Sequence, residues 1–278
     1  MSGFDPHWLA LREPADHAAR NARVLGACAE YLSGRDIVDV VDLGCGAGSN
    51  LRALAPRLPN RQCWRLVDND AVLLDAARQA LIAWADAYDS HGDHLSLRRG
   101  ALRIDVRFEN VDLARRLDPA LGVKADLVTA AALFDLTSER WMREFCDRLA
   151  AMRAPLYAAL TYDGLETWTP SHAADADVRA AFHAHQARDK GFGPGAGPHA
   201  ARALHSMLEA ASFDVRTGRS DWRLDARDDA LVAMLADGVA AACRETRLLS
   251  ANVIDDWRAA RRGANATIGH IDLFATPP

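Results

Sequence analysis

Three glycines at alternate positions, Gly44, Gly46 and Gly48, follow a short apolar run that ends in Asp42, within the stretch VVDLGCGAGSN. Glycines in such a bend let a ligand approach the main chain closely, because they carry no side chain. The amides of the bend and the start of a following helix favour an anionic group such as a carboxylate or a phosphate. The bend therefore predicts a binding site for a small charged molecule.

Two common nucleotide-binding loops fit this bend poorly. A phosphate-binding loop of the NTPases needs a lysine and then a serine or threonine after its last glycine, whereas Gly48 is followed by Ser49 and Asn50. A dinucleotide loop has the spacing GxGxxG, and here the third glycine arrives one residue early, at Gly48. The missing lysine excludes the first loop, and the glycine spacing disfavours the second without excluding it.

The remaining pattern, acid-x-Gly-x-Gly-x-Gly, resembles the first motif of the class I S-adenosylmethionine-dependent methyltransferases. The resemblance covers residues 38–163 well and the rest loosely. It implies S-adenosyl-L-methionine as cofactor, S-adenosyl-L-homocysteine as product, and an acid that faces the cationic amino group of the ligand. The alternative is a structural glycine turn between a strand and a helix, which would contain two of these glycines.

Two further acids add to the resemblance. Asp68 ends the next apolar run, where family members place an acid that accepts hydrogen bonds from both ribose hydroxyls. The alternative role for Asp68 is a solvated aspartate at a strand end. Asp70 is better explained as a helix cap. Asp112 matches the acid that meets the adenine amino group, and its alternative is a cap on a helix that begins at Leu113. Asn69 departs from the apolar residue that often packs on adenine. The predicted cofactor-binding residues are Arg20, Asp42, Gly44, Cys45, Gly46, Gly48, Asn50, Asp68, Asn69, Asn110, Asp112, Leu113 and Ala130.

Arg20 belongs to this set under one condition. It reaches the methionine carboxylate if the N-terminal helix folds over the site, and a solvent-facing arginine is the commoner outcome.

Methyl transfer from a sulfonium is an in-line displacement, so the protein must mainly position the nucleophile and exclude water. A general base is needed only if the nucleophile holds a proton. We therefore predict no catalytic triad.

Residues at the ends of two later apolar runs are candidates for the acceptor side of the site. Asp135 is a possible base or substrate anchor, with a helix cap as the equal alternative, and Tyr162 closes the following strand. The segment HAHQARDKGFG adds cations beside a glycine-rich loop, where a closing lid could hold an anionic group, and a solvated helix end is the alternative. The predicted catalytic residues are Asp135 and Tyr162, and the predicted substrate-binding residues are Phe134, Asp163, His185, Arg188 and Lys190.

No metal site is predicted. His183 and His185 are two residues apart, so on a helix they point in different directions. For Asp163, the alternative to substrate binding is a plain turn that it forms with Gly164.

Strands and helices alternate in the segment that must position these residues. Apolar runs predict strands at 37–41, 63–67, 125–136, 156–161, 213–224 and 267–278, with an edge hairpin over 95–109, and helices are predicted at 14–33, 49–58, 71–88, 138–152, 174–190, 201–211 and 228–245. This rhythm predicts an α/β fold with a doubly wound, mostly parallel sheet. The family resemblance implies a Rossmann-like methyltransferase fold with seven strands, the last one antiparallel.

The chain is predicted to form a single methyltransferase domain over residues 1–278, with helical additions at the N-terminus and in the C-terminal half. Within it we expect an N-terminal helical lid at 1–34, a cofactor-binding core at 35–163, a helical insertion and substrate lid at 164–200, and the remaining sheet and helices at 201–278.

Composition narrows the setting. The 278 residues are 50% hydrophobic and 26% charged with a net charge of −5, which gives no electrostatic reason to expect nucleic acid or an anionic membrane as partner. The 5 cysteines form no CxxC pair and fit reduced thiols. No apolar run spans a bilayer and the N-terminus lacks the pattern of a signal peptide, so we predict a cytoplasmic protein.

The favoured function is therefore methyl transfer to an O, N or C nucleophile of a small molecule. Methylation of RNA or protein is the alternative, and a non-catalytic module that retains S-adenosyl-L-methionine binding is another. A nucleotide-dependent oxidoreductase is disfavoured by the position of the third glycine.

Overall fold

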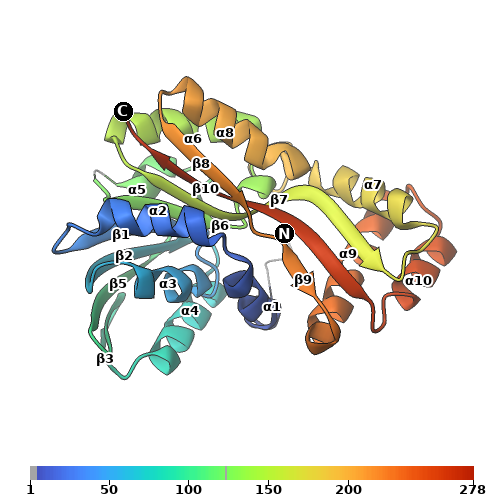
Figure 1. Ribbon diagram of the computed structural model, residues 1–278, viewed down its shortest axis with the longest axis horizontal. Helices are drawn as coiled ribbons and strands as arrows, with labels where there is room; N and C mark the ends of the chain where they lie inside the picture. The colour runs from blue at the N-terminus through green and yellow to red at the C-terminus, as the bar shows by residue number, and fades with distance from the viewer. Residues whose placement is uncertain (1–4, 123) are drawn as a thin grey trace.

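The computed structural model describes residues 5–122 and 124–278, which form one layered α/β fold (Figure 1). Within these residues the strands are β1 Val38–Leu43, β2 Arg61–Asp68, β3 Ala87–His91, β4 His94–Arg99, β5 Leu102–Asn110, β6 Leu127–Ala131, β7 Leu156–Thr169, β8 Asp214–Arg219, β9 Trp222–Leu224 and β10 Asn265–Thr276. The α-helices are α1 Pro6–Ala19, α2 Ala22–Leu32, α3 Ser49–Leu54, α4 Ala71–Trp84, α5 Leu117–Leu121, α6 Glu139–Met152, α7 Asp175–Gln186, α8 Ala200–Ala210, α9 Asp229–Thr246 and α10 Ala251–Ala259. Short 3-10 helices are η1 Ala55–Arg57, η2 Phe134–Leu136, η3 Gly197–His199 and η4 Ala226–Asp228.

The strands form a single sheet in the order β3-β4-β5-β2-β1-β6-β7-β10-β8, and β9 pairs with β10. The strands from β5 to β7 in this order are parallel to one another, whereas β10 is antiparallel to both β7 and β8, and β4 is antiparallel to β5. The seven strands from β5 to β8 thus confirm the predicted α/β fold, including the antiparallel strand. Beyond these seven strands the sheet is extended at one edge by β4, which forms the predicted hairpin with β5, and then by β3.

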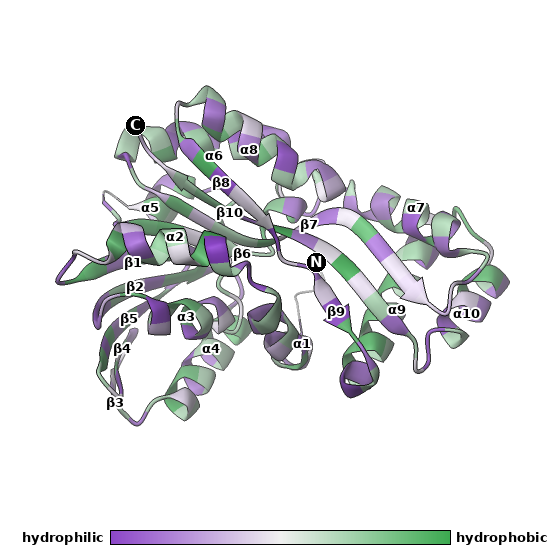
Figure 2. Ribbon diagram, in the orientation of Figure 1, coloured by the Kyte–Doolittle hydropathy of each residue, from purple (hydrophilic) through white to green (hydrophobic). Residues whose placement is uncertain are grey.

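Two hydrophobic layers cover the sheet because successive residues of its central strands face opposite sides. Val40 packs in a core with α2, α3 and α4, and its neighbour Val41 packs in a second core with α6 and α8. Both residues are buried, as expected for a strand covered on both faces. Figure 2 shows hydrophobic residues concentrated on the central strands, while the helices alternate hydrophobic and hydrophilic stretches.

A third core lies where β7 and β10 continue past the central sheet. Their long antiparallel pairing carries Trp168 and Ile268 to α7, α9 and α10, where Trp257 is completely buried (Figure 1). No helix among the described residues has both the length and the apolar content needed to cross a bilayer.

The predicted helix over 14–33 is wrong in one respect that matters for the site. The structure has two helices, α1 and α2, with a break at Arg20 and Asn21. The Asn21 side chain accepts hydrogen bonds from the amides of Arg23 and Val24, which caps α2, and the Asn21 amide donates to Asp272 at 2.8 Å. This break fixes the direction of the Arg20 side chain.

Other boundaries also differ from the predictions. The helix predicted over 71–88 ends at Trp84, because residues 87–91 form β3 and pair with β4. The strand predicted over 213–224 is interrupted between β8 and β9, and α10 was not predicted.

Candidate active site

The glycine bend joins the end of β1 to the start of α3. Gly44, Gly46 and Gly48 have φ angles of 62°, 51° and 72°, which lie in the left-handed region that residues with side chains adopt at a cost. The amide of Gly46 donates a hydrogen bond to Asp68 Oδ2 at 2.9 Å. The bend is therefore braced against the end of β2.

Asp68 organises this corner of the sheet. It is buried, and its other oxygen accepts a hydrogen bond from the Asp70 amide at 3.0 Å. Burial raises the pKa of Asp68, while the amides of Gly46 and Asp70 counteract that rise. Each carboxylate oxygen has a further lone pair, so the group can still accept hydroxyl hydrogen bonds. Asp70 itself caps α4 by accepting from Val72 at 2.9 Å, which confirms its predicted role.

Asp42 lies at the end of β1, next to the bend, and is completely buried. Its Oδ1 accepts a hydrogen bond from Asn50 Nδ2 at 2.7 Å, whereas Oδ2 has no partner. Burial raises the pKa of Asp42 to about 7. Asn50 also donates to Thr129 Oγ1 at 3.0 Å, so β6 helps to hold Asp42 in place. One carboxylate oxygen is thus left for a donor that the described residues do not supply.

Arg20 faces the same corner from the break between α1 and α2. Its side chain is buried, and neither Nε nor Nη1 has a hydrogen-bond partner within residues 5–122 and 124–278. The guanidinium lies 5.9 Å from the ring centroid of Tyr157, and its charge counteracts the raised pKa of Asp42. Asp272 anchors this region, because it accepts hydrogen bonds from the amides of Asn21 and Leu160, both at 2.8 Å.

These two groups are complementary to an α-amino acid. Unpaired N–H groups of Arg20 suit a carboxylate, and the unpaired oxygen of Asp42 suits an ammonium group. Buried polar atoms without partners are uncommon, and leaving each unpaired costs about 1–3 kcal/mol. The corner is therefore built to receive a ligand that carries both charges.

Helix α1 crosses the glycine bend. A Cβ built on Gly46 would lie 3.1 Å from Leu9 Cδ1, so Leu9 packs closely on the bend, and the φ angle of 51° is what favours glycine there. Glu13 Oε1 pairs with Arg52 Nε at 2.8 Å, and His17 Nε2 lies 3.0 Å from Ser49 Oγ. Helix α1 is thereby fastened to α3, which follows the bend.

Glu13→Gln is expected to loosen this attachment. The Arg52 side chain is 7% exposed, so a neutral glutamine leaves this buried charge without its counter-charge, although the Gln oxygen and the Ala47 carbonyl can still accept hydrogen bonds. We expect amide hydrogen exchange to rise at least about tenfold in α1, since local opening becomes easier by about 1.4 kcal/mol or more. Hydrogen-exchange mass spectrometry would measure it. Glu30→Gln on α2 is the control, and equal protection of α1 in both variants would contradict the expectation.

The predicted adenine-side residues lie beside Asp68. The amide of Val111 donates to the Asp68 carbonyl at 2.9 Å, which places the segment after β5 at this corner. Asp112 accepts a hydrogen bond from Ala114 at 3.0 Å and caps a turn, since no helix begins at Leu113. Asn69 is exposed and Leu113 is buried. Of the other predicted residues, Asn110 lies at the end of β5, Cys45 lies within the bend, and Ala130 lies in β6.

Asp135 lies in η2, just past the end of β6. It is 8% exposed and its Oδ1 has no partner. Burial raises its pKa, and the positive charges of Lys190 and Arg12 partly offset that rise. The cap of α6 is Ser138, which accepts from the Trp141 amide at 3.2 Å, so the helix-cap alternative for Asp135 is wrong.

Tyr162 lies in β7 and is buried. Its hydroxyl is 3.0 Å from His183 Nε2. Burial raises the pKa of Tyr162 far above its usual value and lowers that of His183. At neutral pH the pair is therefore an uncharged hydrogen-bonded unit, in which the tyrosine can hold a ligand but does not provide a phenolate base.

Four predicted substrate-binding residues are not brought to this region. Phe134 is core, with its ring 5.4 Å from that of Phe145. Asp163 lies within β7 and pairs with Arg219 at 3.1 Å, so the turn given as its alternative role is wrong. His185 and Arg188 point to α9, where both interact with Glu245.

Sequence reasoning missed two residues of this region, Arg12 and His270. Arg12 makes a bidentate pair with Asp16 and lies 4.9 Å from the ring centroid of Trp222. His270 lies in β10, with its ring 5.2 Å from that of Trp222. A polar histidine in the apolar run IGHIDLF was the one available signal, because a buried histidine in a strand needs a partner.

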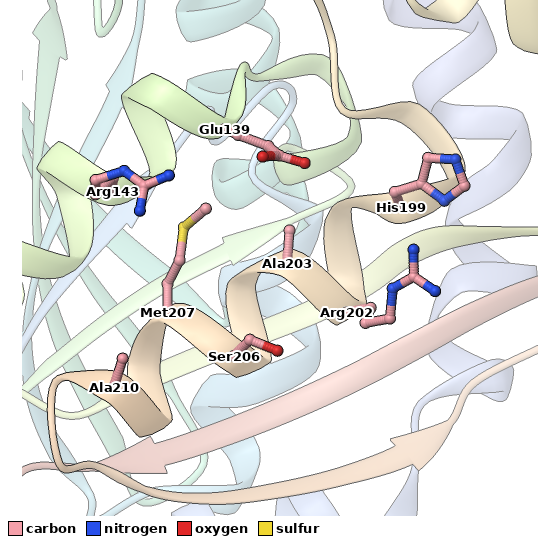
Figure 3. Close-up of a pocket in the computed structure, with 8 residues that line it drawn as sticks. All are labelled: Glu139, Arg143, His199, Arg202, Ala203, Ser206, Met207 and Ala210. Carbon is pink, nitrogen blue, oxygen red and sulfur yellow. The ribbon is translucent and has the colours of Figure 1, made fainter.

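A separate surface pocket of about 390 Å³ lies between α6 and α8. Its lining contains none of the predicted site residues. Figure 3 shows Arg143 and Arg202 on opposite sides of it, with Met207 between the helices. The chemistry of the glycine bend is therefore not located in this pocket.

No protein-family model matches the chain. The chain is 34% identical over 169 residues to trans-aconitate 2-methyltransferase of Azoarcus sp. (strain BH72), a match over 53% of this chain and 62% of that relative. The chain thus spans less than two thirds of the length of the curated relative it matches.

Solved structures resemble the whole fold at low sequence identity. A proposed methyltransferase from Bacillus halodurans C-125 has a TM-score of 0.51 at 12% identity, covering 92% of this chain and 100% of that chain. A cyclopropane-fatty-acyl-phospholipid synthase-like protein from Lactobacillus casei ATCC 334 has a TM-score of 0.52 at 16% identity, covering 94% and 98%. Together with the strand order, these likenesses show that the chain has the Rossmann-like fold of the class I S-adenosylmethionine-dependent methyltransferases.

Proposed function

We propose that the protein is an S-adenosyl-L-methionine-dependent methyltransferase that acts on an O, N or C nucleophile of a small molecule. The observation that carries the proposal is the pairing of two unsatisfied buried groups at the glycine bend. Among the described residues, Arg20 has no hydrogen-bond partner for two nitrogens and Asp42 has none for Oδ2. A methionine-derived ligand carries a carboxylate and an ammonium group, which would satisfy both.

The comparisons support this proposal from a different direction. The curated relative is by name a methyltransferase that acts on trans-aconitate, a small molecule, and its match reaches 34% identity. A dinucleotide has no ammonium group to place against Asp42, so the buried carboxylate favours the sulfonium nucleoside over the oxidoreductase alternative.

The residues present fit the cofactor. Arg20 would hold its carboxylate, Asp42 its ammonium group, and Asp68 the ribose hydroxyls, while the amides of the bend contribute further donors. When bound, S-adenosyl-L-methionine supplies a methyl group on a positively charged sulfur. Leu9 and α1 lie over Gly46 and would exclude water from this region. In this proposal residues 5–34 serve as the cover, and Leu9 is its contact with the bend.

Asp135 and Tyr162 are proposed to meet the acceptor. Tyr162 would donate or accept a hydrogen bond as a neutral hydroxyl. Asp135, with its raised pKa, would take a proton from a methyl-accepting substrate that must lose one, or would donate a hydrogen bond to that substrate when protonated. No described residue needs to form a covalent intermediate for this chemistry.

Calorimetric titration with S-adenosyl-L-methionine, S-adenosyl-L-homocysteine and NAD tests cofactor choice. We expect binding of the first two and none of NAD. Transfer of label from methyl-labelled S-adenosyl-L-methionine would then be measured into metabolite, RNA and protein fractions of an extract. Label confined to metabolites supports a small-molecule acceptor, and label in RNA or protein would overturn that part of the proposal. Cofactor binding without label in any fraction would favour a non-catalytic module.

Cofactor affinity is expected to depend on pH through Asp42. Its pKa of about 7 in the free protein should fall when an ammonium group binds, so binding releases a proton below that pH. Affinity should therefore rise about tenfold from pH 6 to pH 7.5, as the free carboxyl ionises. Titrations across this range measure it, with Asp42→Asn as control. The same pH dependence in Asp42→Asn would contradict the assignment.

A further inference from the structure

One buried carboxylate connects β7 and β10 to the break between α1 and α2. Asp272 lies in β10 and is completely buried. Its Oδ2 accepts hydrogen bonds from the Asn21 amide at 2.8 Å and from the Tyr157 hydroxyl at 3.3 Å. Its Oδ1 accepts a hydrogen bond from the Leu160 amide at 2.8 Å. Both oxygens are therefore engaged, and together they hold three segments that are far apart in the sequence.

The Leu160 amide needs this acceptor because of a bulge in β7. Between two paired positions of these strands, β7 contains Ala159 and Leu160 where β10 contains Asp272 alone. Leu160 has a φ angle of 55°, in the left-handed region that leucine rarely adopts. A bulged residue leaves its amide outside the ladder of the sheet, and a buried amide requires an acceptor. Asp272 lies opposite the bulge and supplies that acceptor with its side chain.

The bulge also changes where the later side chains of β7 point. Leu156 and Ala158 pack in the second core, with α6 and α8. Strict alternation would place Leu160 and Tyr162 there as well. Instead, Leu160 packs in the core with α2, α3 and α4, and Tyr162 packs in the third core, where its hydroxyl lies 3.0 Å from His183 Nε2. The bulge thus sets the direction of Tyr162, on the acceptor side of the proposed site.

The other oxygen of Asp272 supports the cofactor side. Asn21 directly follows Arg20, so the bond from its amide to Asp272 holds the main chain where α1 ends and α2 begins. The Arg20 guanidinium lies 5.9 Å from the ring centroid of Tyr157, whose hydroxyl donates to the same oxygen of Asp272. Arg20 is therefore supported through its main chain and through the ring beside it.

We propose that Asp272 is a positioning residue that sets Arg20, the anchor of the cofactor carboxylate, relative to Tyr162 on the acceptor side. This inference rests on the proposed function, which gives Arg20 and Tyr162 their ligands. Asp272 is buried with both oxygens engaged, so it acts through its neighbours. Asparagine cannot replace it, because one amide oxygen cannot take the place of two carboxylate oxygens that face main-chain amides on opposite sides.

The test compares Asp272→Asn with Asp126→Asn as matched control. Asp126 is also buried, accepts a hydrogen bond from the Asp39 amide at 3.0 Å and pairs with Arg35. It precedes β6 at the amino ends of the central strands, whereas the glycine bend follows the carboxyl end of β1. Calorimetry measures the affinity for S-adenosyl-L-homocysteine, at a temperature where every variant is folded, in the unaltered and in an Arg20→Met background.

Asp272→Asn should weaken S-adenosyl-L-homocysteine at least about tenfold, because an amide loses its acceptor and the segment that carries Arg20 is released. In the Arg20→Met background the same change should weaken binding less than about threefold, because the group that Asp272 positions is absent. Asp126→Asn should leave the affinity unchanged. Equal losses in the two backgrounds would show general destabilisation and overturn the cofactor half of the inference.

The acceptor half is measured as the maximal rate of label transfer into the metabolite fraction. At saturating S-adenosyl-L-methionine, weaker cofactor binding no longer limits this rate. Asp272→Asn should still lower the rate at least about tenfold, and the loss should shrink in a Tyr162→Phe background. Full recovery of the rate at saturation would overturn the link to Tyr162.

A second pair of variants removes the bond from its donor side and leaves Asp272 intact. Asn21 has a φ angle of −70° and follows an extended residue, so proline fits its main chain but lacks the amide that donates to Asp272. Asn21→Ala loses the same cap of α2 and keeps the amide. Asn21→Pro should therefore bind S-adenosyl-L-homocysteine more weakly than Asn21→Ala, and equal affinities would contradict the inference.

Hydrogen exchange in the free protein distinguishes failure of this inference from failure of the proposed function. Exchange at Asn21 and at Leu160 should rise at least about tenfold in Asp272→Asn and stay unchanged in Asp126→Asn. Unchanged exchange at either position in Asp272→Asn would overturn the inference whatever the ligand. Failure of the unaltered protein to bind S-adenosyl-L-homocysteine would instead count against the proposed function.

Discussion

Arg20→Met should weaken the binding of S-adenosyl-L-methionine on the order of 100-fold while leaving the protein at least as stable. The loss of affinity follows from removing a buried charged donor, whose hydrogen bonds to a carboxylate contribute about 1.5–3 kcal/mol. Stability should not fall, because Nε and Nη1 of Arg20 have no hydrogen-bond partners in the described part of the chain and their burial is a cost of folding. Calorimetry and thermal melting measure the two effects.

The control for this variant is Arg23→Met, an exposed arginine three residues further along. It should leave both affinity and melting temperature unchanged. An Arg20→Met variant that binds the cofactor normally would remove Arg20 from the site. A variant that melts well below the unaltered protein would show that the guanidinium is held by bonds within the fold, so that its role is structural.

Asp68→Ala is the second change with a large expected effect. Asp68 accepts hydrogen bonds from the amides of Gly46 and Asp70 and is proposed to receive the ribose hydroxyls. Its removal should lower cofactor affinity on the order of 100-fold and lower the free energy of unfolding by about 1–3 kcal/mol, because buried amides lose their acceptor. Titration with S-adenosyl-L-homocysteine and denaturant unfolding provide the measurements.

Asp70→Ala separates these two contributions. Asp70 caps α4 through the amide of Val72, so its loss should cost about 1 kcal/mol of stability with little change in affinity. If Asp70→Ala weakened the cofactor as much as Asp68→Ala, the effect would come from the loop and the ribose assignment would fail. Unchanged affinity in Asp68→Ala would overturn that assignment directly.

The sequence was sufficient wherever local rules decide the structure. The spacing of Gly44, Gly46 and Gly48 dictates a left-handed bend after β1, and the structure has it. Asp68 and Asp70 received different roles from their positions before a helix, and the structure confirms the cap at Asp70. The parallel order of the central strands also followed from the alternation of strands and helices, because crossover connections leave few other arrangements.

Prediction failed where a partner far along the chain decides the outcome. The break at Asn21 depends on Asp272, a residue 251 positions away, so helical periodicity alone favoured a continuous helix. His185 and Arg188 were expected beside the substrate, but Glu245 on α9 engages both. Unpaired buried atoms, which single out Arg20 and Asp135, are visible only when the packing around them is known.

The long strand β10 has a consequence for how the protein matures. Asp272 on this strand secures the backbone next to Arg20 although 251 residues separate Asp272 from Asn21, and His270 comes from the same strand. During synthesis the amino-terminal helices leave the ribosome long before that anchor exists. The anchor of the backbone beside Arg20 is therefore completed only when β10 takes its place between β7 and β8.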